Sequence, residues 1–356
     1  MREKRSSTIA KFTIALPHGQ QRKAGSQLPA NKRIMTMRNP MTTRRFATFA
    51  AATALLVSAP ALADDVKVAI GISGWTGFAP LTLAKETGIF KKNGLDVTIK
   101  KIPQKDRHLA VASGDIQCAA TTVETWISWN ANGVATKQIF QLDKSYGADG
   151  MAVRNDVAAI KDLKGKTVAA SAPGTAPYFT LAWFLKKNGL SVKDVTVVNL
   201  EPAAAAQAFV AGQNDAAMTY EPYLSTVRSA PDKGKIIATT LDYPMIMDTF
   251  GCTPKFLTEN PKAAKALADS YFEAVEAIAK DQAKSYEVMG ADVKQSGEQF
   301  GNSAKYLRWQ DKAANQKFFA GEHAQFSKEA ADLLLEIGVI KQLPDLKGLA
   351  DTSFIQ

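Results

Sequence analysis

Two glutamates stand at nearly equivalent places in the chain, where their carboxylates could together hold a cationic group. Glu124 and Glu221 each follow, by a few residues, an apolar stretch typical of a buried strand. Ionised carboxylates accept hydrogen bonds from ammonium, amidinium or protonated ring-nitrogen groups and neutralise their charge. Asp143 and Asp149 are further acidic candidates, although either could cap a turn. The alternative for the glutamates is an ordinary solvated charge near a strand end.

A loop that joins a predicted strand to a predicted helix is suited to the opposite charge. It covers residues 172–178 and places Gly174 and Thr175 directly before the helix. The unpaired N–H groups and the dipole at a helix start attract carboxylate, sulfonate or phosphate groups. The simpler alternative is that Thr175 only caps the helix. Residues 75–78 also open a helix at a strand end, so we expect the two loops to face each other.

Aromatic side chains are concentrated in these same loops. Loop positions beyond strand ends are poor core positions, so we interpret the aromatics as the walls of a ligand slot, whose ring faces also suit a cation. The predicted ligand-binding residues are Trp75, Thr76, Phe78, Thr122, Glu124, Trp126, Asp143, Tyr146, Gly174, Thr175, Tyr178 and Glu221.

The loops contain no arrangement typical of an enzyme or of a metal site. After residue 63 the chain has only His108 and His323, and neither lies near a cysteine or four residues from another histidine. No G-x-S-x-G sequence occurs. We therefore predict binding without catalysis, with no metal and no cofactor. Two alternatives stay open: an exported enzyme that uses Glu124 and Glu221 as acid and base on a small heterocycle, and a ligand-sensing domain for a membrane receptor.

An internal repeat indicates how these loops are held. The sequence of residues 82–84 recurs at 180–182, and that of residues 91–95 recurs at 186–190. Two copies exclude a solenoid and predict two similarly built lobes. The cleft between two lobes is a usual place for a small ligand.

Each copy predicts a strand-helix-strand-helix-strand unit. The predicted strands are 66–70, 95–99, 116–121, 167–171, 195–200 and 215–219, and the predicted helices are 80–92, 106–113, 176–187 and 203–211. Such alternation builds parallel sheets, whose ligands bind beyond the carboxyl ends of the strands. From residue 260 onward the pattern is helical.

The predicted fold is α/β, with two lobes that each hold a mostly parallel sheet flanked by helices. Lobe 1 is expected to comprise residues 64–147 and 246–356, and lobe 2 residues 148–245. A two-strand hinge is expected to join them, with crossings near residues 141–153 and 239–248.

The net charge of +10 belongs to the N-terminal segment. Residues 1–63 carry 11 basic side chains and one acidic side chain, whereas the rest of the chain carries 33 of each. A neutral body without basic runs argues against nucleic acid or an anionic membrane as a partner.

The end of that segment is typical of a signal peptide. Two arginines, an apolar run and the sequence Ala61-Leu62-Ala63 lie within residues 41–63. We predict cleavage near Ala63 and export to the periplasm. Residues 1–40 show no periodicity and are expected to be a non-native or disordered extension.

Cys118 and Cys252 are the only cysteines of the chain. An oxidising compartment would permit a disulfide between them. Cys118 lies inside a predicted apolar strand, and free cysteines are commonly buried. We therefore favour two reduced, buried thiols, with the disulfide as the alternative.

Five short motifs extend over the part of the chain that follows Asp64. They are APL-x-LAKE-x-G-x-F at 79–90, GLDV at 94–97, ASGD at 112–115, LKGKTV at 163–168 and YEPY at 220–223. In combination they resemble the nitrate-, sulfonate- and taurine-type substrate-binding proteins of ABC importers, whose superfamily includes binders of thiamine pyrimidine precursors. The resemblance implies a type II-like periplasmic binding protein, a monomer that closes around a small solute and delivers it to the ABC permease. It also implies that the loops described above form the site.

One position departs from the pattern of the sulfonate binders. Those proteins often place His or Gln directly before the aromatic residue at the start of the second helix, whereas here Pro177 precedes Tyr178. A sulfonate would lose that polar contact. Together with the acids, this favours an amine-containing or zwitterionic solute within the taurine, nitrate and pyrimidine classes.

Overall fold

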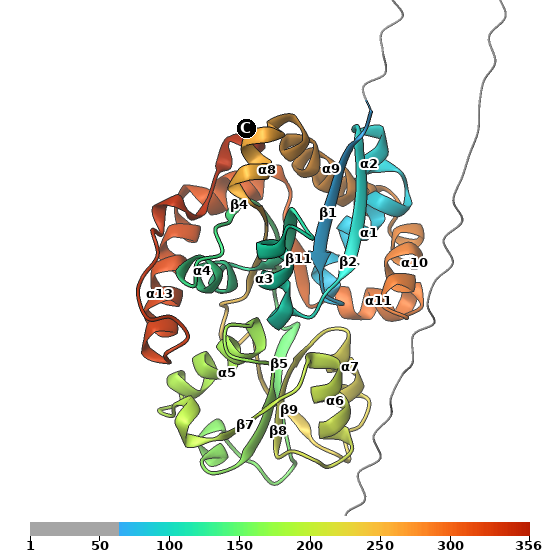
Figure 1. Ribbon diagram of the computed structural model, residues 1–356. Coiled ribbons are helices and arrows are strands. Elements are labelled where there is room, and N and C mark those ends of the chain that lie inside the picture. Colours follow the sequence, from blue (N-terminus) through green and yellow to red (C-terminus); the bar gives the residue numbers. More distant parts are fainter. Residues whose placement is uncertain (1–63) are drawn as a thin grey trace, which may run out of the picture. The chain divides into compact units, whose positions relative to one another are not determined.

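Residues 64–356 are the part of the chain that the computed structural model describes, and they form two β-sheets flanked by helices (Figure 1). The predicted signal peptide and the extension before it lie outside the described residues. The first sheet has the strand order β11-β4-β10-β3-β1-β2. Its strands are β1 (Val66–Ile72), β2 (Leu95–Lys101), β3 (Cys118–Thr122), β4 (Lys137–Ser145), β10 (Met247–Cys252) and β11 (Leu307–Trp309).

The second sheet has the order β7-β6-β8-β5-β9. Its strands are β5 (Asp149–Val153), β6 (Thr167–Ala170), β7 (Thr196–Asn199), β8 (Ala216–Tyr220) and β9 (Lys235–Thr239). The repeated units give the parallel part of each sheet, in which β1 pairs with β2 and β3, and β6 pairs with β7 and β8. The other strands are antiparallel to their neighbours. The α/β class with two sheets is confirmed, but the sheets are mixed where we predicted mostly parallel ones.

Helices connect the parallel strands at the predicted places. They are α1 (Ala79–Glu86), α2 (Ile89–Lys92), α3 (Gln104–Ser113), α4 (Val123–Ala131), α5 (Ala176–Lys187), α6 (Pro202–Val210) and α7 (Tyr223–Arg228). Helix α5 has the predicted bounds. The predicted helix 80–92 is divided in two, because Gly88 adopts a left-handed conformation with φ of 78°.

The C-terminal segment is helical, as its periodicity predicts. Its helices are α8 (Pro254–Glu259), α9 (Pro261–Lys280), α10 (Gln282–Asp292), α11 (Gly297–Ala304), α12 (Lys312–Lys317) and α13 (His323–Glu336). Helices α9 and α10 pack against α1 beside the first sheet (Figure 1). The apolar face of α13 packs with buried side chains of both α4 and α5, so it joins the helices of the two sheets. Within residues 64–356 no helix is both long enough and apolar enough to cross a bilayer.

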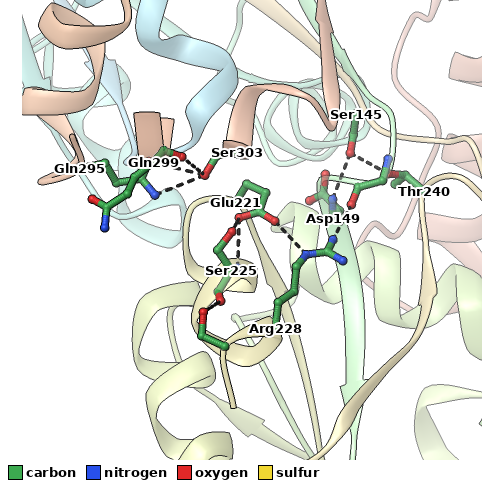
Figure 2. Close-up of polar contacts among 11 residues, drawn as sticks. Ser145, Asp149, Glu221, Ser225, Arg228, Thr240, Gln295, Gln299 and Ser303 are labelled. Atoms are coloured by element: carbon green, nitrogen blue, oxygen red, sulfur yellow. Dashed lines mark hydrogen bonds and ion pairs between the residues drawn. The ribbon is translucent and has the colours of Figure 1, made fainter. Parts of the chain in front are cut away.

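Two short segments carry the chain between the sheets. Residues 146–148 lead from β4 to β5, and residues 240–246 lead back from β9 to β10. The Ser145 and Thr240 hydroxyls lie 2.7 Å apart, and the Gly147 N–H donates to Thr240 Oγ1 over 2.8 Å (Figure 2). These bonds tie the two crossings side by side.

A disulfide joins Cys118 to Cys252, so our preference for two free thiols is wrong. Cys118 lies on β3 and Cys252 directly opposite it on the antiparallel neighbour β10. The sequence does not reveal this contact, because the cysteines are 134 residues apart and the strand β10 enters the sheet from a distant part of the chain.

We predict that reduction of this disulfide destabilises the protein by about 2–5 kcal/mol, because a long loop of the unfolded chain becomes unrestrained. Urea unfolding with and without dithiothreitol measures the effect. The double variant Cys118→Ala/Cys252→Ala is the control and should be insensitive to the reductant. An identical urea midpoint for oxidised and reduced wild-type protein would contradict the prediction.

Candidate functional site

A pocket lies between the two sheets, where strands β1, β3 and β8 end. Its cavity volume is about 20 Å³, roughly the space of one water molecule, so the pocket is nearly filled in this structure. Its lining residues are Ser73, Trp75, Phe78, Gln104, Arg107, Thr122, Asp149, Ala176, Tyr220, Ile246 and Asp248. Both sheets contribute to this lining, as expected for a ligand held beyond the carboxyl ends of parallel strands. A wider depression beside Lys67 and Lys91 lies at the opposite, amino end of β1, which is not where such sheets bind ligands.

Four buried carboxyl groups surround this pocket. Asp149 and Asp248 line it, while Glu124 and Asp143 lie in contact with its walls, and each side chain is at most 4% exposed. Burial raises the pKa of Glu124 to about 8 and that of Asp149 to about 7. Burial, and then the repulsion of neighbouring acids, holds the pKa values of Asp143 and Asp248 well above the usual range.

Three oxygens of these carboxyl groups have no hydrogen-bond partner among the described residues. They are Glu124 Oε2, Asp149 Oδ2 and Asp248 Oδ2. A buried oxygen without a partner costs free energy, and such atoms are uncommon in folded proteins. Their concentration around one pocket makes it the candidate site.

The aromatic wall is fixed by one of the acids. The Trp75 Nε1–H donates to both oxygens of Asp143, over 3.2 and 3.3 Å. The Trp75 ring meets that of Tyr220, from the second sheet, edge to face at 5.3 Å. A Cβ atom at Gly77 would lie 2.2 Å from both Asp143 Oδ2 and Trp75 Nε1, so only glycine permits this contact. Trp75 and Phe78 are thus rigid walls of the pocket.

Arg107 brings a buried positive charge to the pocket. Its guanidinium donates to the Ala120 and Ile102 carbonyls, over 2.6 and 2.9 Å, and its Nε has no hydrogen-bond partner within residues 64–356. Burial lowers the pKa of Arg107 to about 10, so the side chain stays charged at neutral pH. The lining therefore contains one cation and two carboxyl groups, with the carboxyl groups of Glu124 and Asp143 behind it.

Glu221 is buried but does not line the pocket, which corrects its predicted pairing with Glu124. Its carboxylate contacts Ser225 and Arg228 instead (Figure 2). One of its oxygens accepts hydrogen bonds from the Ser225 N–H and hydroxyl, over 3.1 and 2.7 Å, and the other accepts from Arg228 Nε over 3.3 Å. Its carboxylate is thus already occupied by the start of α7. Asp149 and Asp248 take the place that we had assigned to Glu221.

The structure brings together some of the other predicted site residues. Trp75, Phe78 and Thr122 line the pocket, and Thr122 donates a hydrogen bond to Glu124. Thr76 is buried beside them, and its N–H donates to the Glu221 carbonyl over 3.3 Å.

Several predicted site residues lie elsewhere. Tyr146 is 51% exposed and lies under the Arg308 guanidinium. Trp126 is a core residue packed edge to face on Trp129. The side chain of Tyr178 does not line the pocket. Gly174 and Thr175 line a separate groove that also includes Lys105 and His108.

Our sequence analysis missed Gln104, Arg107, Tyr220 and Asp248. A signal for each was present. Tyr220 directly follows the predicted strand 215–219, Asp248 ends the predicted return crossing, and the other two follow the predicted strand 95–99 by five and eight residues. The rule that ligands lie beyond strand ends, applied to every predicted strand and crossing, would have included them.

Comparison with known proteins agrees with this architecture. Residues 75–285 match the family described as NMT1/THI5 like, so the chain belongs to that family. A binding protein of Brucella abortus is 27% identical over 214 residues, and the taurine-binding periplasmic protein of Escherichia coli is 25% identical over 214 residues. Each match covers 58% of this chain and 65% of the relative, so it spans less than two thirds of these proteins.

Solved structures share the fold. The alkanesulfonate-binding protein SsuA from Xanthomonas axonopodis, bound to MOPS, superposes with a TM-score of 0.71 at 18% identity, covering 82% of this chain and all of that one. The fold is therefore that of the periplasmic binding proteins.

We predict that Arg228→Ala destabilises the protein by about 1–3 kcal/mol, because it leaves a buried carboxylate without its charged partner. Urea unfolding measures the loss. In the double variant Arg228→Ala/Glu221→Gln the buried charge is gone, so part of the stability should return. A double variant that is as unstable as the sum of the two single variants would show that the residues do not act as a pair.

We also predict that the ligand-free protein loses stability as the pH rises from 5 to 8. Burial raises the pKa of Asp149 to about 7 and that of Glu124 to about 8, so in this interval the folded protein holds protons that the unfolded chain has released. Asp149→Asn should flatten the slope and stabilise the protein at pH 8 by on the order of 1–3 kcal/mol. Thermal melts at several pH values measure both effects.

The control for this experiment is Asp96→Asn, since Asp96 is an exposed acid on β2. Its variant should keep the wild-type slope. Equal changes in melting temperature at pH 5 and pH 8 for Asp149→Asn would contradict the assignment of the slope to Asp149.

Proposed function

We propose that the protein is the extracytoplasmic solute-binding component of an ABC importer. In this proposal it captures a small polar solute that contains an amine or is zwitterionic, and delivers it to the permease. The observation that carries the proposal is the pocket between the sheets, which Asp149 of the second sheet and Asp248 of the first both line beside Trp75. Each of the two carboxyl groups has one oxygen without a hydrogen-bond partner among residues 64–356. Carboxylates and an aromatic face are together suited to an ammonium-type group.

The relatives support binding rather than catalysis. The curated relatives described above are named as binding proteins, one of them for taurine. Taurine is itself a zwitterion with an ammonium group. The two histidines of the described residues add nothing catalytic to the pocket, since neither lines it.

We propose further that the two sheets belong to lobes that open and close, with residues 64–147 and 246–356 in one lobe and residues 148–245 in the other. The crossings tied by Ser145 and Thr240 would serve as the hinge. The Thr76 N–H to the Glu221 carbonyl, and the ion pair between Lys186 and Glu336, are contacts that opening would break. The ion pair can be exchanged at small cost, because both of its side chains are exposed.

A thermal-shift screen of the protein without residues 1–63 tests the proposal, because a ligand of the folded state raises the melting temperature by mass action. The screen includes amino acids, betaines, polyamines, aminopyrimidines, taurine, other sulfonates and nitrate. The best ligand is then measured by calorimetry. A screen in which no compound raises the melting temperature would contradict the proposal.

The affinity for a cationic solute is predicted to rise with pH between 6 and 8. A positive charge favours the ionised acids, whose burial raises the pKa of Asp149 to about 7 and that of Glu124 to about 8, so binding releases protons. The dissociation constant should fall by up to about tenfold per pH unit and level off above pH 8. A solute bound through a negative charge would show the opposite slope.

The matched variants are Asp248→Asn and Glu221→Gln. Both remove a buried carboxylate, but only Asp248 lines the pocket. Asp248→Asn should weaken binding about 10- to 100-fold, since it removes a charged hydrogen-bond acceptor, whereas Glu221→Gln should leave the affinity within about threefold. Equal losses in both variants would argue that the acids act only through the fold.

A further inference from the structure

The sequence predicted an anionic group at the start of helix α5. In the structure, a side chain of helix α3 already accepts a hydrogen bond there. The Ala176 N–H, the first of α5, donates to Gln104 Oε1 over 3.3 Å. Gln104 lies at the start of α3 and is buried. Its amide thus bridges the two halves of the pocket at the position where a sulfonate or carboxylate would meet the N–H groups of α5.

The orientation of the Gln104 amide is dictated by its partners. A backbone N–H can only donate, so the atom that faces Ala176 must be the amide oxygen. The amide nitrogen then donates to the hydroxyls of Thr121 and Thr125, over 2.8 and 3.0 Å. Both ends of the amide are therefore satisfied, and the side chain is held in place.

A series of hydrogen bonds with one donor direction leads from Gln104 to Glu124. Thr122 donates its hydroxyl to Glu124 Oε1, so its own oxygen accepts from Thr125, 2.8 Å away. Thr125 in turn accepts from Gln104. Each donor in the series thus points away from the α5 start and toward Glu124. The first N–H of α5 is thus taken by the Gln104 amide oxygen, and Glu124 keeps its other oxygen without a partner among residues 64–356.

We propose that Gln104 is a specificity-determining residue: by occupying the start of α5 and directing its hydrogen bonds to Glu124, it closes the pocket to anionic groups and leaves it to cationic ones. The inference deepens the proposed function and rests on it for the identity of the site. It narrows the solute from amine-containing or zwitterionic to one that is gripped by its positively charged group.

The charges around the pocket agree with this assignment. An anion at the start of α5 would lie near Asp149, Asp248 and Glu124, which repel it or must stay protonated. Arg107 sets one buried positive charge against them, but its terminal nitrogens already donate to backbone carbonyls, so only its Nε–H is left without a partner among residues 64–356. Removal of the Gln104 side chain would free the Ala176 N–H, a helix donor at the lining of the pocket.

Binding of methanesulfonate and methylammonium to wild type, Gln104→Ala and Gln104→Glu tests the proposal by thermal shift and Trp fluorescence at constant ionic strength. Wild type should bind methylammonium and leave methanesulfonate unbound. Gln104→Ala should gain methanesulfonate binding at least about tenfold tighter than wild type. Gln104→Glu keeps an oxygen for the Ala176 N–H and should reject methanesulfonate as wild type does. Lys105→Ala, at the exposed neighbouring position, is the control and should match wild type.

The outcomes separate this inference from the proposed function. Wild-type binding of methanesulfonate that Gln104→Ala weakens would overturn the role of Gln104, while solute binding itself would stand. A folded Gln104→Ala that gains no anion binding would overturn it as well. A gain of anion binding in Gln104→Ala, with no amine bound by any variant, would support the block at α5 and contradict the amine assignment.

Discussion

The cost of burying four carboxyl groups between two sheets is the constraint around which this structure is organised. Each of Glu124, Asp143, Asp149 and Asp248 is almost fully removed from solvent, and burial raises the pKa of every one. A protein interior tolerates such groups when they are protonated, hydrogen-bonded or paired with a cation. Asp143 is satisfied by Trp75, whereas oxygens of the other three have no partner among the described residues. The fold thus holds three carboxyl oxygens without a hydrogen-bond partner among residues 64–356 around one pocket, and the proposed cationic solute rests on that arrangement.

The surrounding structure holds these carboxyl groups around one small pocket. The Trp75 indole donates a hydrogen bond to Asp143, and the Gly77 backbone lies too close to both for any larger residue. Tyr220 of the second sheet contacts the indole ring edge to face. Arg228 and Ser225 take Glu221 out of the site, although it is as buried as the rest. Helix α13 packs its apolar face on both α4 and α5, so the helices that begin at the pocket share one core. Different elements thus supply the carboxyl groups of the pocket, hold its aromatic wall and fix the helices that begin there.

Sequence patterns predicted the helices and strands better than the long-range contacts between them. The bounds of α5 and the order of strands and helices in each repeated unit follow from local periodicity, which depends on neighbouring residues alone. The antiparallel strands β4, β10 and β11 and the disulfide between Cys118 and Cys252 depend on segments more than 100 residues apart, which no local pattern records. Of the candidate site residues, Trp75, Phe78 and Thr122 line the pocket in the structure. The direction in which Glu221 points, and the core position of Trp126, required the packed structure.

The sequence by itself determined that the chain after residue 63 is a neutral α/β protein built from two similar units, with acids and aromatics gathered where the strands end. Those features depend on composition and short-range periodicity. Only the tertiary structure decided which acids act together, because Asp149 and Asp248 meet through the two crossings and Glu221 is turned away by α7. It also decided the chemistry at the start of α5. A helix start in the sequence suggests an anion site, but the side chain of Gln104, 72 residues earlier, already supplies the acceptor.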